Sequence, residues 1–513
     1  MRAPAAGGGM GRRAEGLQRG RDVMEMSERG LARDRVVVIG AGLTGLAAAH
    51  RLVARGAAGS RRPAEVVVLD AKDRIGGAIW TKSVDGFTLE GGADSFITNK
   101  PWAHDLCREL GLGDQLIGTD DRHRRSFVVR NGRLVPVPEG FVLMAPGKLA
   151  PLLASPILSA RGKARLLLDL VIPRKADDAD ESLASFVRRR LGREALDRLV
   201  QPLVGGIYTA DPNELSLKAT LPQYPQMERE HGSLILGARR QARRARAAER
   251  GASGARYGLF ASLAGGMGTL PRALADALPA RTIRTSTAVR RVARGAGPYP
   301  WRVELLDGPS IDATGVILTT EAHASARLLD ATDPELAQGL RSIPYASSAI
   351  VTVGYRRDQI RHPLDGFGAV VPALEERSIL AMSFLSVKFP TRAPADSALI
   401  RVFVGGATQA DLFDRDDDEI TAIVRRELGE LIGATGEPTL VDVGRHPRAM
   451  PQYTLGHLDR VAAIAQRAAR HPGLVLAGNA FGGVGIPDCV RSGQEAATAL
   501  LQTLADPAAP AAA

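Results

Sequence analysis

Short runs of apolar residues alternate along the chain with amphipathic stretches, and this pattern predicts a mixed α/β fold. Residues 36–39 and 66–69 contain only valine, isoleucine and leucine, as expected of strands buried on both faces of a parallel sheet. The first run leads into an apolar helical pattern, and a further buried strand is expected within 473–479. These segments predict a parallel sheet covered by helices.

A second set of strands is expected between residues 343 and 404. The apolar runs there, at 349–355, 378–385 and 398–404, are separated by turns that contain proline and glycine, which predicts a mostly antiparallel sheet. Three more strands, expected at 287–292, 301–306 and 314–320, would return the chain to the first sheet. A hairpin should turn at Asn131–Gly132.

Helical periodicity predicts helices at 101–112, 161–170, 181–191, 193–200, 271–278, 417–432 and 490–504. The run 141–160 is the most lipid-like stretch, but Lys148 and three prolines argue against a spanning helix. It is expected to form either a pocket wall or an interfacial segment that touches a membrane. The basic, weakly apolar stretch 228–256 is interpreted as a surface excursion.

These elements predict a division into a disordered leader and three parts. The leader covers 1–34, with Met24 or Met26 as alternative starts of the protein. The expected parts are a Rossmann-like dinucleotide-binding domain at 35–120, 258–325 and 435–505, a helical lobe that contacts a membrane at 121–217, and a substrate domain at 218–257 and 326–434.

The first apolar run ends in a glycine-rich turn that indicates nucleotide binding. Gly40, Gly42 and Gly45 have G-x-G-x-x-G spacing between a strand and a helix. The first glycine permits a tight turn, the second lets a pyrophosphate approach the backbone, and the third allows close packing of helix and strand. Asp70, at the end of the next strand, suits a ribose hydroxyl and disfavours a 2′-phosphate.

A second glycine pair follows directly and points to FAD. Arg74 is followed by Gly76 and Gly77, with a threonine at position 81. A domain that binds only NAD does not need this second pair just after its ribose acid. A flavoprotein does, because the isoalloxazine ring extends beyond the pyrophosphate.

The charge of the chain indicates which kinds of partner it binds, and its cysteine content indicates the cellular compartment. The net charge is +11 with pI near 10.0, yet aromatic residues make up only 4% of the chain. The arginine clusters lack interleaved aromatic residues, so we expect a solvated face or an anionic membrane contact and no nucleic-acid partner. Cys107 and Cys489 cannot form a disulfide framework and lack metal-ligand neighbours. We therefore expect no metal site and a cytoplasmic protein, either free or peripheral on the inner face of the membrane.

With these motifs the chain resembles the FAD-dependent porphyrinogen oxidases of haem synthesis, within the amine-oxidase-like flavoproteins. The resemblance runs from about residue 35 to 504 and includes both glycine motifs. The segments specific to this branch are Leu89–Phe96, Gln201–Thr209 and Gly482–Cys489.

The resemblance implies FAD contacts along the whole nucleotide. Contacts to the pyrophosphate and the adenosine would come from Gly40, Ala41, Gly42, Leu43, Thr44, Gly45, Asp70, Ala71 and Val289. Contacts to the ribityl chain and the ring would come from Arg74, Gly76, Gly77, Ala78, Gly92, Ala93, Asp94, Ser95, Asn479, Val484, Gly485 and Ile486. The superfamily usually has Glu at position 70 and Asp at position 479, and both replacements keep the hydrogen-bonding capacity.

The resemblance also implies the reaction. A porphyrinogen, either coproporphyrinogen III or protoporphyrinogen IX, would be oxidised to the porphyrin while six electrons pass to O₂ and give hydrogen peroxide. Flavin N5 would carry the chemistry, so no catalytic side chain is expected. An amine oxidase, a carotenoid-type desaturase and a non-catalytic flavin-binding scaffold are the alternatives.

Two cations are candidates for binding the substrate carboxylates. Lys100 matches a lysine of the bacterial coproporphyrinogen-type enzymes, and Arg125 is next to the position of an arginine in eukaryotic members. The alternative for Lys100 is a cap on the loop before Pro101. The sequence leaves the oligomeric state open, with a homodimer as one alternative.

Overall fold

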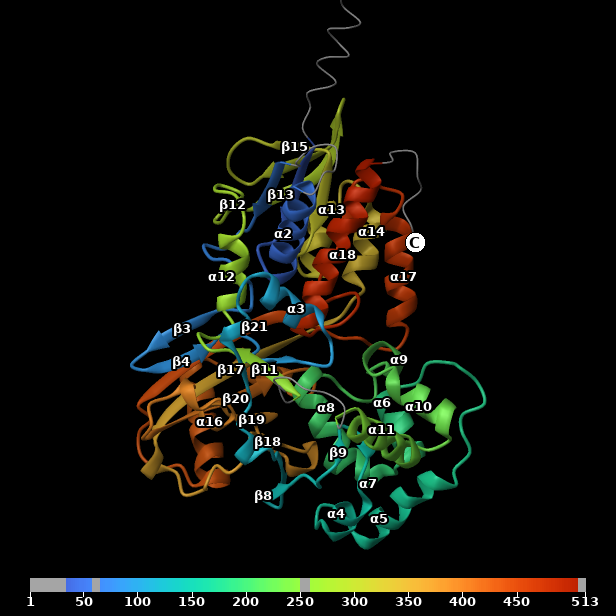
Figure 1. Cartoon of the computed structure of the whole chain (residues 1–513), viewed down its shortest axis with the longest axis vertical. Helices are drawn as coiled ribbons and strands as arrows, with labels where there is room; N and C mark the ends of the chain where they lie inside the picture. Colours follow the sequence, from blue (N-terminus) through green and yellow to red (C-terminus); the bar gives the residue numbers. More distant parts are fainter. Residues whose placement is uncertain (1–33, 58–64, 250–258, 506–513) are drawn as a thin grey trace, which may run out of the picture.

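The computed structural model describes residues 34–57, 65–249 and 259–505. The predicted leader lies outside these residues except for Asp34. The described chain has three parts: a part built on a parallel sheet, a large mostly antiparallel sheet, and a lobe of helices beside that sheet (Figure 1). The predicted fold class is therefore confirmed.

The parallel sheet has five strands in the order β12-β2-β1-β16-β22. Every neighbouring pair is parallel, and β1 lies at the centre with Val36–Ile39 buried. The strands are β1 (Arg35–Ile39), β2 (Glu65–Leu69), β12 (Ile283–Arg284), β16 (Gly315–Leu318) and β22 (Leu474–Leu476).

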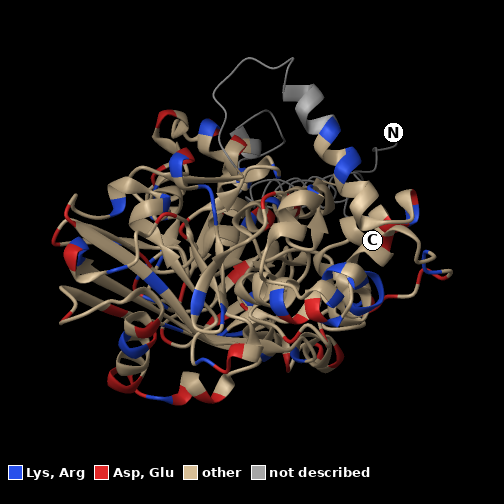
Figure 2. Ribbon diagram, turned by 90° about the horizontal axis from the view of Figure 1, so that it is seen from below, with Lys and Arg blue, Asp and Glu red and all other residues tan. Residues whose placement is uncertain are grey.

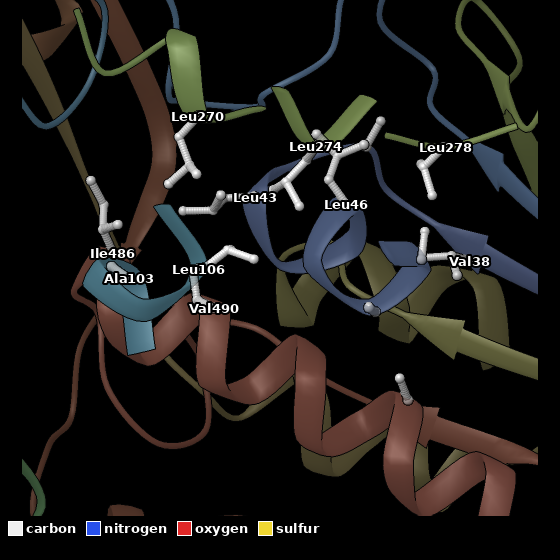
Figure 3. Close-up of a cluster of buried hydrophobic side chains, with 14 of the residues drawn as sticks. Val38, Leu43, Leu46, Ala103, Leu106, Leu270, Leu274, Leu278, Ile486 and Val490 are labelled. Carbon is white, nitrogen blue, oxygen red and sulfur yellow. The ribbon is translucent and has the colours of Figure 1, made fainter. Parts of the chain in front are cut away.

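Four helices cover one face of this sheet. Figure 3 shows side chains from these helices, among them Leu46, Leu274 and Val490, in one apolar cluster that extends to Val38 of the sheet. A Cβ on Gly493 would lie 2.2 Å from the carbonyl oxygen of Thr44, so the last helix presses directly on the first. The four helices are α2 (Leu43–Ala57), α3 (Trp102–Glu109), α12 (Thr269–Asp276) and α18 (Ile486–Ala505).

The opposite face of the parallel sheet packs on a second layer. Trp301 is fully buried there. The layer contains the three-stranded sheet of β13 (Val289–Ala296), β14 (Tyr299–Leu305) and β15 (Ile311–Ala313), with the helices α13 (Ala322–Leu329), α14 (Pro334–Arg341) and α17 (His457–Ala468).

The large sheet has seven strands in the order β21-β17-β20-β19-β18-β7-β8. All neighbours are antiparallel except β18 and β7. Helix α16 (Asp417–Ile432) packs on one face through Ile420, Val424 and Leu428. The strands are β7 (Phe127–Arg130), β8 (Arg133–Pro136), β17 (Tyr345–Arg356), β18 (Gly368–Val370), β19 (Ala381–Phe384), β20 (Ser397–Gly405) and β21 (Leu440–Pro451).

The helical lobe has its own apolar core. Inside it, Arg190 is fully buried and binds the carboxylate of Asp169. The helices that share this core are α4 (Leu149–Ala154), α5 (Ala160–Leu167), α6 (Leu183–Arg190), α7 (Arg193–Ala195), α8 (Gln201–Tyr208), α9 (Leu217–Thr220), α10 (Gln223–His231) and α11 (Leu234–Glu249).

Two short sheets link these parts. A β3–β4 hairpin follows the second glycine motif and leads into the turn at Gly91–Ser95, and a three-stranded sheet places β11 between β5 and β6. The strands are β3 (Thr81–Val84), β4 (Phe87–Glu90), β5 (Phe96–Ile97), β6 (Leu116–Gly118) and β11 (Phe260–Leu263). In the lobe, β9 (Phe141–Val142) pairs with β10 (Ala145–Pro146).

Several segments lie elsewhere than predicted. The stretch 228–256 is not a surface excursion: as far as residue 249 it forms the end of α10 and α11, and Leu234 and Ile235 are fully buried because these helices complete the lobe core. Of the three strands expected to return to the first sheet, only β16 does.

The predicted domain boundaries also differ from the sheet pairing. The hairpin around Asn131–Gly132 forms as β7–β8, but it joins the large sheet rather than the lobe. Strand β21, predicted within the nucleotide-binding domain, is the opposite edge of that same sheet. Both strands belong to the large sheet because they pair with strands distant in the sequence. The local sequence of each strand does not specify this pairing.

Candidate functional site

The first glycine turn joins β1 to α2, and its glycines have different physical roles. A Cβ on Gly45 would lie 1.9 Å from the carbonyl oxygen of Gly40, so position 45 must be glycine for helix and strand to pack. A Cβ on Gly42 would meet nothing nearer than the Cα of Gly77, at 4.0 Å. The protein's own packing therefore does not require Gly42, and the space beside it is available to a ligand.

The two glycine motifs form one continuous backbone cradle. The Gly76 amide donates to the Ala41 carbonyl at 2.8 Å, and Gly42 and Gly76 form a parallel bridge. Gly77 adopts a φ of 60°. The guanidinium of Arg74 donates to the carbonyl of Gly77 at 2.7 Å and so holds this second turn.

The acid at the end of β2 lies at one end of this cradle. The carboxylate of Asp70 accepts hydrogen bonds from the amides of Ala41, at 2.7 Å, and Lys72, at 2.8 Å. The Thr287 amide donates to the Asp70 carbonyl at 2.7 Å, which brings the start of β13 at Val289 beside this edge. Ala71 is exposed there. The structure thus brings together the residues predicted to contact the adenosine.

The turn after β4 packs against the second glycine motif at its other side. A Cβ on Gly92 would lie 2.4 Å from the carbonyl oxygen of Ala78. Asp94 in this turn is buried and accepts a hydrogen bond from the Ser95 hydroxyl at 2.6 Å. Ala93 is exposed beside them.

Two cations from the large-sheet part hold Asp94. Lys388 lies 2.7 Å from one carboxylate oxygen of Asp94 and Arg401 lies 3.1 Å from the other. Burial alone would raise the pKa of Asp94, but the positive charges of Lys388 and Arg401 hold it well below its usual range. Arg401, itself 1% exposed, also donates to the carbonyl of Gly92.

Sequence reasoning missed Lys388 and Arg401. For Arg401 a signal was present, since it is a charged residue within the apolar run 398–404. A cation at such a position requires a buried partner, because an unpaired buried charge is too costly. The sequence does not show which acid supplies it.

The C-terminal glycine segment closes the cradle at the start of α18, and we call residues 479–488 the closing segment. The Tyr453 hydroxyl donates to the Asn479 carbonyl at 2.6 Å and accepts from the Gly483 amide at 2.8 Å. Val484 packs against the lobe core, and Ile486 begins the helix. The unpaired amides of this helix start favour an electron-rich ligand group.

The two predicted substrate cations lie in different places. The Lys100 ammonium lies 2.8 and 2.7 Å from the two carboxylate oxygens of Asp488, on the closing segment, and its side chain is 39% exposed. Arg125 is exposed and lies two residues before β7, and it forms an ion pair with Asp365 at 3.3 Å. The structure therefore joins Lys100, but not Arg125, to the closing segment.

These residues fit an extended dinucleotide. Polar groups near Asp70 and Val289 form one end, the two glycine turns form the middle, and the turn at Gly92–Ser95 with the closing segment forms the other end. The open space beside Gly42 fits a pyrophosphate, because this group approaches the backbone closely only where there is no side chain.

Comparisons with known proteins agree with this geometry. Residues 43–501 match the family model described as flavin containing amine oxidoreductase. The chain is 33% identical to coproporphyrinogen III oxidase of Bacillus subtilis (strain 168), over 92% of this chain and 99% of the relative. It is 36% identical to coproporphyrinogen III oxidase of Propionibacterium freudenreichii subsp. freudenreichii, over 93% of this chain and 92% of the relative.

A solved structure supports the same assignment. The crystal structure named "Putative protoporphyrinogen oxidase" from Exiguobacterium sp. 255-15 superimposes with a TM-score of 0.79 and 30% sequence identity, covering 91% of this chain and 98% of that one. The chain therefore belongs to the family of flavin-containing amine oxidoreductases and is an oxidoreductase with FAD as its cofactor.

Proposed function

We propose that this enzyme oxidises a porphyrinogen to the porphyrin, with coproporphyrinogen III as the preferred substrate and O₂ as the electron acceptor. The observation that carries this proposal is the pair of relatives named coproporphyrinogen III oxidase, each matching almost the whole chain. Lys100, whose ion pair with Asp488 joins it to the closing segment, supports the proposal, because a substrate with several carboxylates needs a cation close to the flavin.

The proposed substrate position is the junction of the three parts of the molecule. There α8 of the lobe lies on the large sheet, since a Cβ on Gly206 would be 3.7 Å from the side chain of Val370. Tyr208, the last residue of α8, has its pKa raised to about 12 by burial and by the negative charge of Asp488. The ion pair of Lys100 and Asp488 therefore lies close to the end of α8.

The protein's task at this junction is binding and orientation. When bound, the flavin supplies the chemistry by accepting two electrons in each round of oxidation. Lys100 would hold a propionate and so orient the macrocycle, and the apolar surface of the sheet and α8 would exclude water. The Lys100 ammonium already forms an ion pair with Asp488. A substrate carboxylate that binds this ammonium therefore has to share it with Asp488.

Oxygen uptake with each porphyrinogen tests the substrate proposal. We expect Lys100→Met to raise the KM for coproporphyrinogen III more than about tenfold, because a hydrogen bond to a charged group contributes ~1.5–3 kcal/mol. The KM for protoporphyrinogen IX should rise less, since it carries two propionates instead of four. Equal losses on both substrates would contradict selection by Lys100. A change below about threefold on both would remove it from the site.

Asp488 requires a control, because Lys100→Met removes the nearer partner of this carboxylate, whose side chain is only 6% exposed, and leaves it only the longer ion pair with Arg491, at 3.9 Å. The double variant Lys100→Met with Asp488→Asn removes both charges. If the ammonium binds substrate, the double variant keeps the raised KM. Asp488→Asn alone should not raise the KM, since it frees Lys100.

We further propose that the helical lobe makes a peripheral contact with an anionic membrane. Its surface exposes a group of apolar side chains: Val142, Leu153, Leu168, Leu170 and Val171. Lysines and arginines lie on the same lobe, for example along α11 (Figure 2). Apolar side chains combined with basic residues are typical of interfacial contact.

A further inference from the structure

The segment between β21 and α17 connects all three parts of the molecule, and we call Gln452–Leu455 the joint segment. It binds the lobe through the Ser216 amide, which donates to the Tyr453 carbonyl at 2.8 Å, and through the Leu455 amide, which donates to the Glu214 carbonyl at 2.9 Å. It binds the entry to β17 through the Gln452 amide, which donates to the Pro344 carbonyl at 2.8 Å.

One side chain extends this connection to the flavin site. Tyr453 is 2% exposed, and its hydroxyl bridges two backbone groups of the closing segment, the Asn479 carbonyl and the Gly483 amide. Its ring stacks on His457, with centroids 4.0 Å apart and planes 13° from parallel. The hydroxyl cannot move toward one group without losing the other.

Both bridged groups belong to the part of the chain that closes over the cofactor. Gly483 has a φ of 133°, so its conformation is one that only glycine adopts readily. A loop of this kind has little rigidity of its own, and a buried amide without a partner costs free energy. The hydroxyl of Tyr453 therefore stabilises one loop geometry out of several.

We propose that Tyr453 is a positioning residue for the flavin site, which holds the closing segment at Asn479–Gly483 in register with the helical lobe. The role depends only on where the cofactor binds, and it holds for any substrate. Removing the hydroxyl should loosen the closing segment and speed flavin release, while the fold and the apolar packing of the ring stay unchanged.

The test compares Tyr453→Phe with Tyr224→Phe in the holoenzyme. Tyr224 is a matched control, because it is 4% exposed and its hydroxyl also binds a backbone carbonyl, that of Val142, inside the lobe. Flavin fluorescence reports release of FAD, and tryptophan fluorescence reports unfolding during the same temperature ramp. We expect Tyr453→Phe to release FAD well before it unfolds and to bind FAD roughly tenfold more weakly. In Tyr224→Phe the two signals should move together.

Equal FAD affinity and coincident signals in Tyr453→Phe would overturn the proposal. If Tyr453→Phe does not fold, hydrogen exchange on the wild-type holoenzyme decides instead. Peptides covering 478–486 and 452–457 should then lose protection together on FAD removal, and independent exchange would contradict the coupling.

Discussion

At the scale of single residues, two glycines of the first turn have different roles: Gly45 is required for packing, and Gly42 leaves space for the ligand. Gly45 faces the Gly40 carbonyl so closely that any side chain would displace α2 from β1. A Cβ on Gly42 would face open space, and within the described part of the chain it would meet only the Cα of Gly77, at 4.0 Å. The two positions are glycine for different reasons. A substitution of Gly45 should therefore affect the fold, whereas a substitution of Gly42 should affect FAD binding.

We expect Gly42→Ala to fold normally but to lose most of its FAD affinity, by at least about tenfold, because its Cβ would occupy the position of the pyrophosphate. Visible absorbance of the purified protein and titration of the apoprotein with FAD measure this. Gly113→Ala is the control, since a Cβ there meets only the Arg108 side chain, at 3.9 Å. A full flavin spectrum in Gly42→Ala would show that the cradle is assigned wrongly.

At the scale of elements, buried charges connect the turn after β4 to the large-sheet part. Arg401 of β20 and Lys388 at the end of α15 (Leu385–Lys388) both bind Asp94. A nearby arginine, Arg392, is fully buried and donates to the carbonyls of Leu263 and Ala264, so it joins the same region to β11. The cradle therefore depends on the large-sheet part for its shape.

Asp94→Asn should destabilise the folded protein by about 3–5 kcal/mol at neutral pH, because the buried Arg401 and the largely buried Lys388 lose their carboxylate partner. Urea unfolding followed by circular dichroism measures the free energy of unfolding. Asp442→Asn is the control. It removes an ion pair with Lys82, whose side chain is 47% exposed, and such surface pairs contribute about 0–1 kcal/mol.

The same carboxylate sets the direction of a pH effect. Because the folded-state pKa of Asp94 lies below its ordinary value, its ionised form stabilises the fold at every pH above about 4. This contribution declines as the pH falls below that value. The stability difference between wild type and Asp94→Asn should therefore shrink below pH ~4, and a difference that grows there would contradict the assignment.

At the scale of the whole molecule, the lobe stands beside the large sheet and presents its own outer surface (Figure 1). Among the residues that the structure describes, no helix is long and apolar enough to cross a membrane. The proline-broken run 141–160 forms β9, β10 and the short helix α4 instead. The interfacial contact that we propose depends instead on the exposed apolar side chains of the lobe.

We expect the wild-type protein to float with anionic vesicles at low salt and to be released at high salt, because the basic residues contribute mainly long-range attraction. The double variant Leu170→Glu with Val171→Glu, at positions 41% and 74% exposed, should bind less. Leu306→Glu, 61% exposed on the FAD-binding part, is the control and should bind like wild type. A bound fraction that only detergent releases would contradict a peripheral contact.

Much of the fold could be predicted from local pattern. The buried runs at Val36–Ile39 and Val66–Leu69 became neighbouring parallel strands, and the expected helix 417–432 coincides with α16. Backbone sterics and side-chain periodicity act over a few residues, so the sequence near each element suffices. Misplaced segments such as α11 and β13 were those whose surroundings come from distant parts of the chain.

The sequence by itself determined the cofactor class, because the glycine spacings and the strand and helix around them are local features. Only the tertiary structure decided which groups support the cradle. Arg401 meets Asp94 across 307 positions of the chain and Lys100 meets Asp488 across 388. The physical reason is that a buried charge or hydroxyl needs a hydrogen-bonding partner, but the residues next to it in the sequence do not show which distant residue that partner is. The path of the folded chain selects the partner, as it does for Tyr453 at the joint segment.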